Sequence, residues 1–158
     1  MMTQASVLIV DDEPSVRETL SEWLKRKNFR VLEAENGRQA LEKIRLEDLD
    51  MVIADVVMPV MNGIDLLKQA KVDNADIPFL MISGYPAYST AVNIMQLGAS
   101  DYLQKPFTPE EFSRRVSHAL RLKALSKPFA AAKGILLGAA LATVLWVLII
   151  WALAALLS

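Results

Sequence analysis

Asp55 directly follows the apolar run 51–54 and is the residue of this chain best placed for nucleophilic chemistry. A continuous apolar run of this length is typical of a strand buried on both faces. Asp55 would then lie at the carboxyl end of that strand, which is the edge of an open α/β sheet where ligands bind. Pro59 and Asn62-Gly63 predict a turn immediately afterwards. Taken alone, Asp55 could equally be a carboxylate that only caps a loop.

Three further strands are predicted to end at polar or charged residues. These are 6–10, followed by Asp11-Asp12; 78–82, followed by Ser83; and 101–104, followed by Lys105. Because the carboxyl ends of parallel strands share one edge of a sheet, we expect these side chains to converge on Asp55. Three carboxylates at one place repel one another unless a cation lies among them, and oxygen-only ligands suit Mg²⁺. A lysine and a hydroxyl opposite would complement phosphoryl oxygens, so the set predicts a carboxylate nucleophile for phosphoryl transfer.

The elements that must position these residues alternate along the chain. Strands are predicted at 6–10, 29–34, 51–54, 78–82 and 101–104, and apolar residues at helical spacing follow each of them, within 14–24, 36–44, 64–70, 91–97 and 109–120. Five strands alternating with five helices predict an α/β fold with a parallel sheet and right-handed crossovers.

Composition excludes several classes of function. The 158 residues carry a net charge of −1, which offers no electrostatic basis for binding nucleic acid. There is no cysteine, and therefore no disulfide, thiolate chemistry or cysteine-based metal site. The N-terminus lacks the charged and apolar regions of a signal peptide, so the first 125 or so residues are expected to be a cytoplasmic globular domain.

Taken together, the motifs resemble the receiver domain of two-component response regulators, over about residues 5–125. They are Asp11-Asp12, Asp55 with Met58-Pro59 and Asn62-Gly63, Ser83-Gly84, and the run Asp101-Tyr102-Leu103-Gln104-Lys105-Pro106-Phe107. The resemblance implies a doubly wound, flavodoxin-like sheet of order 2-1-3-4-5. It also implies a phosphoacceptor switch, which catalyses only its own phosphorylation and dephosphorylation.

The resemblance assigns a role to each site residue. Asp55 would accept a phosphoryl group from a histidine of a partner kinase or phosphotransfer protein, and Ser83 and Lys105 would contact that group. Asp11 or Asp12, Asp55 and the backbone carbonyl of Val57 would hold Mg²⁺. Tyr102 would be the aromatic residue whose rotamer follows Ser83, and Lys105-Pro106 would be a cis peptide. Val57 and Tyr85 stand at positions that tune phosphate lifetime in the family, and neither obviously positions a water, which favours a long-lived phosphate.

Other interpretations account for fewer residues. A haloacid-dehalogenase-type phosphatase needs an acid at position 57, which is Val57, and the glycine patterns of P-loop and Rossmann nucleotide sites are absent. A receiver that binds partners without phosphorylation stays open, although every chemical position is filled. His118 is the only histidine, and an ordinary surface role is expected for it.

A separate segment is predicted at the C-terminus. The stretch 134–157 holds 24 residues without a charge, about 36 Å as a helix, enough to cross a hydrocarbon core of about 30 Å. The linker 126–133 carries Lys127 and Lys133, and the positive-inside rule then places the receiver on the cytoplasmic side of the plasma or inner membrane. The small residues Gly134, Gly138 and Ala142 could pair two such helices into a homodimer.

The sequence thus predicts a receiver anchored to the membrane by one C-terminal helix. No stretch is left for a DNA-binding output domain, so we expect the output to be a protein contact at the membrane. A phosphate sink and a phosphorylation-independent membrane scaffold are the alternative hypotheses. The cognate kinase, the stimulus and the downstream partner are not specified by any residue pattern.

Overall fold

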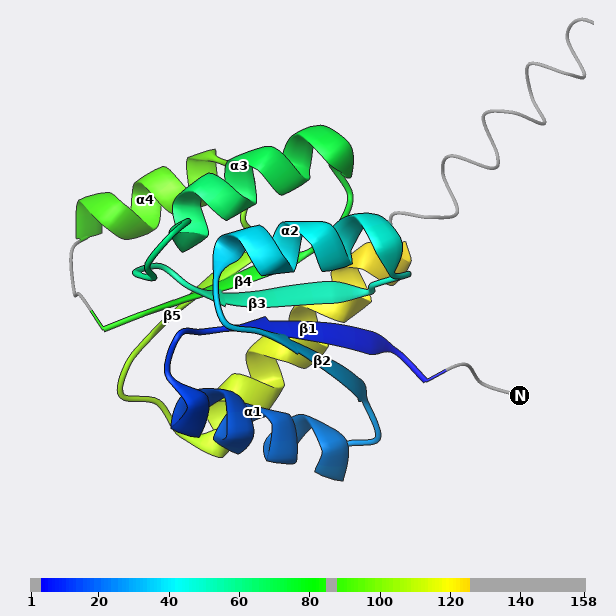
Figure 1. Cartoon of the computed structure of the whole chain (residues 1–158). Helices are drawn as coiled ribbons and strands as arrows, with labels where there is room; N and C mark the ends of the chain where they lie inside the picture. Colours follow the sequence, from blue (N-terminus) through cyan, green and yellow to red (C-terminus); the bar gives the residue numbers. More distant parts are fainter. Residues whose placement is uncertain (1–3, 85–87, 126–158) are drawn as a thin grey trace, which may run out of the picture. The chain divides into compact units, whose positions relative to one another are not determined.

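The computed structural model describes residues 4–84 and 88–125. These residues form a parallel sheet of five strands in the order β2-β1-β3-β4-β5, as the sequence predicts (Figure 1). The strands are β1 (Ser6–Val10), β2 (Arg30–Ala34), β3 (Met51–Asp55), β4 (Phe79–Ser83) and β5 (Asp101–Gln104). The helices are α1 (Pro14–Arg26), α2 (Gly37–Leu46), α3 (Gly63–Asp73), α4 (Tyr88–Gln96) and the last helix, residues 109–125.

The predicted strands 6–10 and 101–104 match β1 and β5, and the other three differ from the observed strands by one residue at one or both ends. The predicted strand 29–34 begins at Arg30, and the predicted strand 78–82 runs from Phe79 to Ser83. Pro78 has no amide proton to donate to a neighbouring strand, so β4 begins after it. Asp55 and Ser83 are thus the last residues of β3 and β4 rather than the first residues beyond them.

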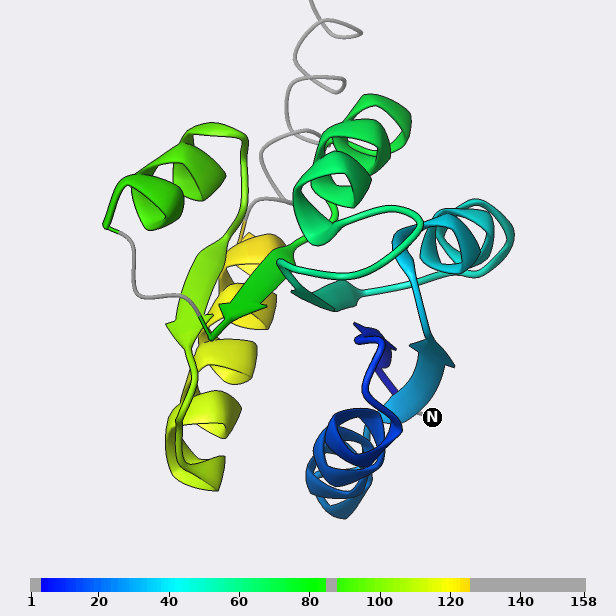
Figure 2. The same ribbon diagram turned by 60° about the vertical axis from the view of Figure 1, so that its left-hand side comes forward.

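Two helical layers enclose the sheet. Helices α2, α3 and α4 cover one face, and α1 and the last helix cover the other (Figures 1 and 2). Every residue of β1, β3 and β4 is buried, as continuous apolar strands between two layers require. One apolar cluster lies on the α2–α4 side, around Leu66, Leu67 and Phe79, and a second lies on the α1 side, around Leu24, Ile53 and Phe112.

Asparagine caps begin α2 and α3. The side chain of Asn36 accepts a hydrogen bond from Gln39 N at 3.0 Å, and that of Asn62 accepts one from Asp65 N at 2.8 Å. Each cap satisfies an amide that the helix itself leaves unpaired. The Asn62 cap thereby sets where α3 begins and where the loop after Asp55 ends.

The chain up to Lys123 forms one compact unit. The predicted linker 126–133 and the predicted membrane helix 134–157 lie outside the described residues. Within residues 4–84 and 88–125, no helix is both long and apolar enough to cross a bilayer.

Candidate functional site

The strand register brings the predicted site residues to one edge of the sheet. Asp55 pairs with Ile82 of β4, and Ser83 pairs with Gln104 of β5. The amide of Lys105 donates to the carbonyl of Ser83 at 2.8 Å, so the chain leaving β5 stays against the end of β4. Figure 2 turns this edge, with the carboxyl ends of the strands, toward the reader.

The loop after Asp55 folds closely over that residue. The Asp55 carboxylate accepts a hydrogen bond from the amide of Val57 at 2.8 Å, and the amide of Gly63 donates to the carbonyl of Val56 at 3.0 Å. A Cβ atom at position 63 would collide with the backbone carbonyl oxygen of Asp55. Gly63 is therefore required for the close approach of α3 to Asp55. The sequence marks this glycine only as part of a turn.

Val60 takes a conformation that its residue type does not predict. Its φ is 67°, in the left-handed region, and its side chain is exposed. A β-branched residue is disfavoured there because its Cβ crowds the following carbonyl. The strain lies in the loop that joins Asp55 to α3, and strained backbone is often found at functional sites.

Lys105 joins the two buried carboxylates of the site. Its Nζ lies 2.7 Å from Asp55 Oδ1 and 3.1 Å from Asp11 Oδ2. Asp11 follows β1 and Lys105 follows β5, so the lysine side chain reaches past the ends of β4 and β3 to meet both acids. Asp11 and Asp55 are almost fully buried, whereas the Lys105 side chain is 30% exposed and closes the site from the solvent side.

Burial and the neighbouring charges shift the pKa values of Asp11 and Lys105. Burial raises the pKa of the Asp11 carboxyl above its usual value, against the hydrogen bond from Glu13 N and the charge of Lys105, which lower it. Burial alone would lower the pKa of Lys105, but hydrogen bonds and charges from Asp55 and Asp11 outweigh it and raise that pKa. The ammonium therefore stays charged at neutral pH and compensates two acids that are shielded from water.

The predicted convergence of three carboxylates is not present in this structure. Asp11 and Asp55 share the Lys105 ammonium, while Asp12 is exposed. Among the residues described, no three histidine, cysteine or acidic side chains are grouped as metal ligands. The donor chemistry nevertheless suits a hard cation, because two buried carboxylates already converge on one positive charge. The carboxylates of Asp11 and Asp55 and the backbone carbonyl of Val57 would supply the oxygens that hold Mg²⁺. Asp12 is the exposed acid next to Asp11.

Ser83 and Tyr102 lie on β4 and β5, the two strands next to β3 on the side of Lys105. Ser83 ends β4 and is 1% exposed, and Tyr102 is a half-buried residue of β5 that packs against the apolar cluster on the α2–α4 side. The peptide bond between Lys105 and Pro106 is cis, as the resemblance implied. His118 is exposed on the last helix, in agreement with the ordinary surface role expected for it.

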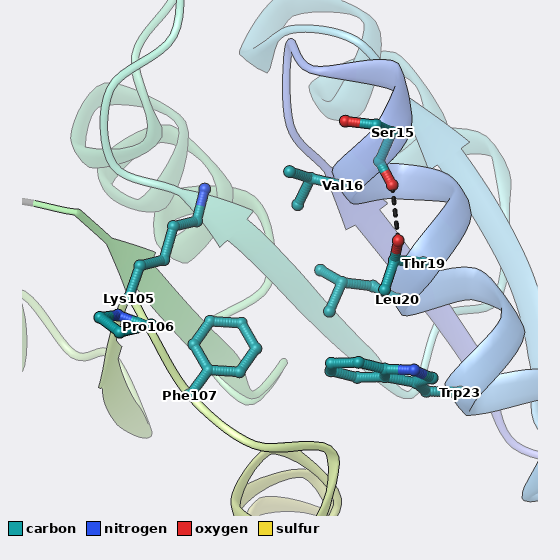
Figure 3. A pocket seen from close by; sticks show the side chains of 8 residues that line it. All are labelled: Ser15, Val16, Thr19, Leu20, Trp23, Lys105, Pro106 and Phe107. Atoms are coloured by element: carbon teal, nitrogen blue, oxygen red, sulfur yellow. Dashed lines mark hydrogen bonds between the residues drawn. The ribbon is translucent and has the colours of Figure 1, made fainter.

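A cleft that the sequence did not predict opens beside Lys105 (Figure 3). Its volume is about 290 Å³, and it lies between α1 and the segment that follows β5. Trp23 and Phe107 form its floor with ring centroids 6.4 Å apart, and Leu20 lines its wall. An apolar surface thus adjoins the charged site.

Comparison with known proteins identifies the protein family of this chain. The response regulator receiver domain family matches residues 7–117, and the chain belongs to that family. It is 40% identical over 124 residues to the transcriptional regulatory protein ZraR of Klebsiella oxytoca, covering 78% of this chain and 28% of that protein. It is 35% identical over 122 residues to the alkaline phosphatase synthesis transcriptional regulatory protein PhoP of Bacillus subtilis, covering 77% of this chain and 51% of that protein.

Solved structures agree with this assignment. A putative response regulator from Chloroflexus aurantiacus is 33% identical and superposes with a TM-score of 0.72, covering 75% of this chain and 99% of that one. The chain spans about half or less of the length of the two regulators named above. The similarity therefore concerns their receiver portion.

Proposed function

We propose that this receiver takes a phosphoryl group on Asp55 from a phosphohistidine of a partner kinase or phosphotransfer protein. The observation that carries the proposal is the contact of 2.7 Å between Asp55 Oδ1 and Lys105 Nζ at the carboxyl edge of the sheet. In the transfer, a carboxylate oxygen of Asp55 forms a bond to phosphorus as the bond from phosphorus to the histidine nitrogen breaks. The leaving imidazole stays with the partner.

Each neighbouring residue has a separate part in this transfer. Mg²⁺, when bound, would neutralise charge that develops on the phosphoryl oxygens. The Val57 amide orients the Asp55 carboxylate through its hydrogen bond of 2.8 Å. Lys105 is already charged and lies within reach of the place where the phosphoryl oxygens would arrive. Its ammonium can therefore move from the carboxylates to those oxygens.

Phosphorylation is proposed to change the conformation of the domain through Ser83 and Tyr102. A phosphoryl group adds about −1.5 to −2 charges and attracts the Lys105 ammonium and the Ser83 hydroxyl. Movement of Ser83 would give Tyr102 room to turn inward, which would alter the face made by α4, β5 and the last helix. NMR of Lys105→Ala tests this step: phosphorylation should continue while the shift changes become small. Shift changes equal to those of the wild type would contradict it.

The output of the switch is proposed to be a protein contact. Asp55→Asn serves as the test, because it keeps the size of the side chain and removes the nucleophile. A partner that is captured from extracts only by the phosphorylated wild type supports the switch. Equal capture by Asp55→Asn points to a scaffold, and a short-lived phosphate with no partner points to a phosphate sink.

We also propose that residues 134–157 anchor the receiver to the cytoplasmic face of a membrane. The support is compositional: 24 uncharged residues preceded by Lys127 and Lys133. Tethering would confine the receiver to the surface where membrane kinases work and raise its effective concentration there. Truncation after residue 125 should yield a soluble protein that still reacts with a small phosphodonor. Extraction of the full chain by carbonate would contradict the anchor.

A further inference from the structure

Three exposed apolar side chains lie at the ends of helices on the side of the unit away from Asp55. Leu46 ends α2 and is 84% exposed, Val72 lies next to the end of α3 and is 86% exposed, and Leu122 lies near the end of the last helix and is 48% exposed. We call these three residues the apolar rim. Leu46 and Val72 are the two most exposed large apolar residues in the part of the chain that the structure describes.

Ion pairs bring the ends of α2 and α3 together. Arg45, which precedes Leu46, pairs with Asp73, which follows Val72, at 2.7 Å. Glu47, directly after α2, pairs with Arg30 at the start of β2 at 3.0 Å. The carboxyl ends of α2 and α3, which carry Leu46 and Val72, therefore lie at the amino end of the strands, opposite the edge that carries Asp55 (Figure 1).

The last helix is tied to the same edge. Lys123 Nζ donates to the carbonyl of Asp50 at 3.1 Å and to its carboxylate at 3.3 Å. Asp50 in turn accepts a hydrogen bond from the amide of Ser6, the first residue of β1, at 3.0 Å. The neighbour of Leu122 is thus held at the start of the central strands.

The covalent path of the chain favours this edge as the one nearest to the proposed anchor. Ten residues, 124–133, join Lys123 to the uncharged stretch 134–157, and fully extended they reach no more than about 35 Å. The edge that carries the rim is where this short tether is attached. The edge that carries Asp55 would need the tether to pass along the whole depth of the domain before it could meet the same surface.

We propose that the apolar rim rests on the lipid surface, with Leu46 and Val72 among the headgroups and the Asp55 edge turned toward the cytoplasm. This inference depends on the proposed membrane anchor. The ion pairs Arg45–Asp73 and Arg30–Glu47 leave no net charge from these four residues, so apolar contact is proposed to provide the attraction. The orientation leaves the cleft of Trp23 and Phe107 open to a partner.

The absence of cysteine allows a direct test in the full chain. Leu46→Cys and Val72→Cys are labelled with an environment-sensitive fluorophore and reconstituted into phosphatidylcholine–phosphatidylglycerol vesicles. Val60→Cys is the matched control, because Val60 is 72% exposed and lies on the opposite edge. We expect labels at 46 and 72 to emit at shorter wavelength, to resist iodide and to be quenched by nitroxide-bearing lipids. The label at 60 should behave as in water.

The outcomes separate this inference from the anchor itself. If the protein floats with the vesicles but labels at 46 and 72 match the label at 60, the rim does not face lipid while the anchor stands. Protection from iodide without quenching by nitroxide lipids would mean that a second copy or another protein surface covers the rim, and would overturn the inference. A protein that does not float with the vesicles would overturn both proposals.

Discussion

The Nζ of Lys105 lies 2.7 Å from Oδ1 of Asp55, although 50 residues separate them in the chain. The same ammonium lies 3.1 Å from Asp11 Oδ2. One lysine is thus the shared counter-charge of the two carboxylates that would hold a metal ion, and a divalent cation has to share them with the lysine or displace it.

This contact predicts the magnesium affinity of Lys105→Ala. Removing the ammonium leaves Asp11 and Asp55 without their counter-charge, so Mg²⁺ should bind more tightly than to the wild type, by roughly tenfold, or about 1.4 kcal/mol. Titration calorimetry measures the change. Lys68→Ala, which removes an exposed lysine paired with Asp65, is the control and should leave the affinity unchanged. Weaker binding in Lys105→Ala would show that the lysine supports the metal site instead of competing with it.

Gly63→Ala should damage the site through its backbone. The new Cβ would collide with the carbonyl oxygen of Asp55, so the loop must move and Asp55 with it. We expect a loss of at least about 2 kcal/mol in the free energy of unfolding and a strong fall in phosphorylation. Gly84→Ala is the control, since a Cβ there would meet nothing within 4 Å. Equal behaviour of the two variants in urea unfolding would contradict the packing argument.

Val60→Gly should stabilise the protein. Glycine adopts a φ of 67° without the steric cost that valine bears, so the free energy of unfolding should rise by about 1 kcal/mol. Asn28→Gly gives the comparison, because Asn28 has a φ of 63° but asparagine tolerates this region. Thermal unfolding should show a clear gain for Val60→Gly and a smaller one for Asn28→Gly. A lower melting temperature for Val60→Gly would mean that the exposed valine makes a favourable contact.

Lys71 should impose an alkaline dependence on stability. Burial lowers its pKa below the ordinary value of 10.5, while the charge of Asp76 works in the opposite direction. Because the folded state holds this proton more weakly than the unfolded chain, stability relative to Lys71→Met should rise as the pH climbs from the lowered folded pKa toward 10.5. Urea unfolding across this window checks the sign. A difference that is constant or falls with pH would contradict it.

The strands and their order could be predicted because their patterns are local. The runs that became β1, β3 and β4 are uninterrupted apolar segments between turn residues, and each is buried throughout. Only helical layers on both faces of a parallel sheet can bury such strands. The polar residue at each strand end then placed Asp11, Asp55, Ser83 and Lys105 at one edge.

The remaining features depend on contacts between distant residues. No local pattern shows that Lys105 bridges Asp11 and Asp55 while Asp12 stays exposed, because the lysine and Asp11 are 94 positions apart in the chain. The left-handed conformation of Val60 is contrary to its residue type and follows from closure of the loop between β3 and α3. The cleft beside Lys105 depends on how Trp23 and Phe107 meet across two elements.

Phosphorylation of Asp55 is the central claim, and intact mass measures it directly. The wild type, Asp55→Asn and Asp12→Asn are incubated with Mg²⁺ and a small phosphodonor. Asp12→Asn is the control, because Asp12 has the same side chain as Asp55 but is exposed. We predict one phosphoryl adduct on the wild type, none on Asp55→Asn, and an adduct on Asp12→Asn that needs more Mg²⁺. A phosphoryl adduct that persists on Asp55→Asn would contradict the assignment of Asp55 as the phosphoacceptor.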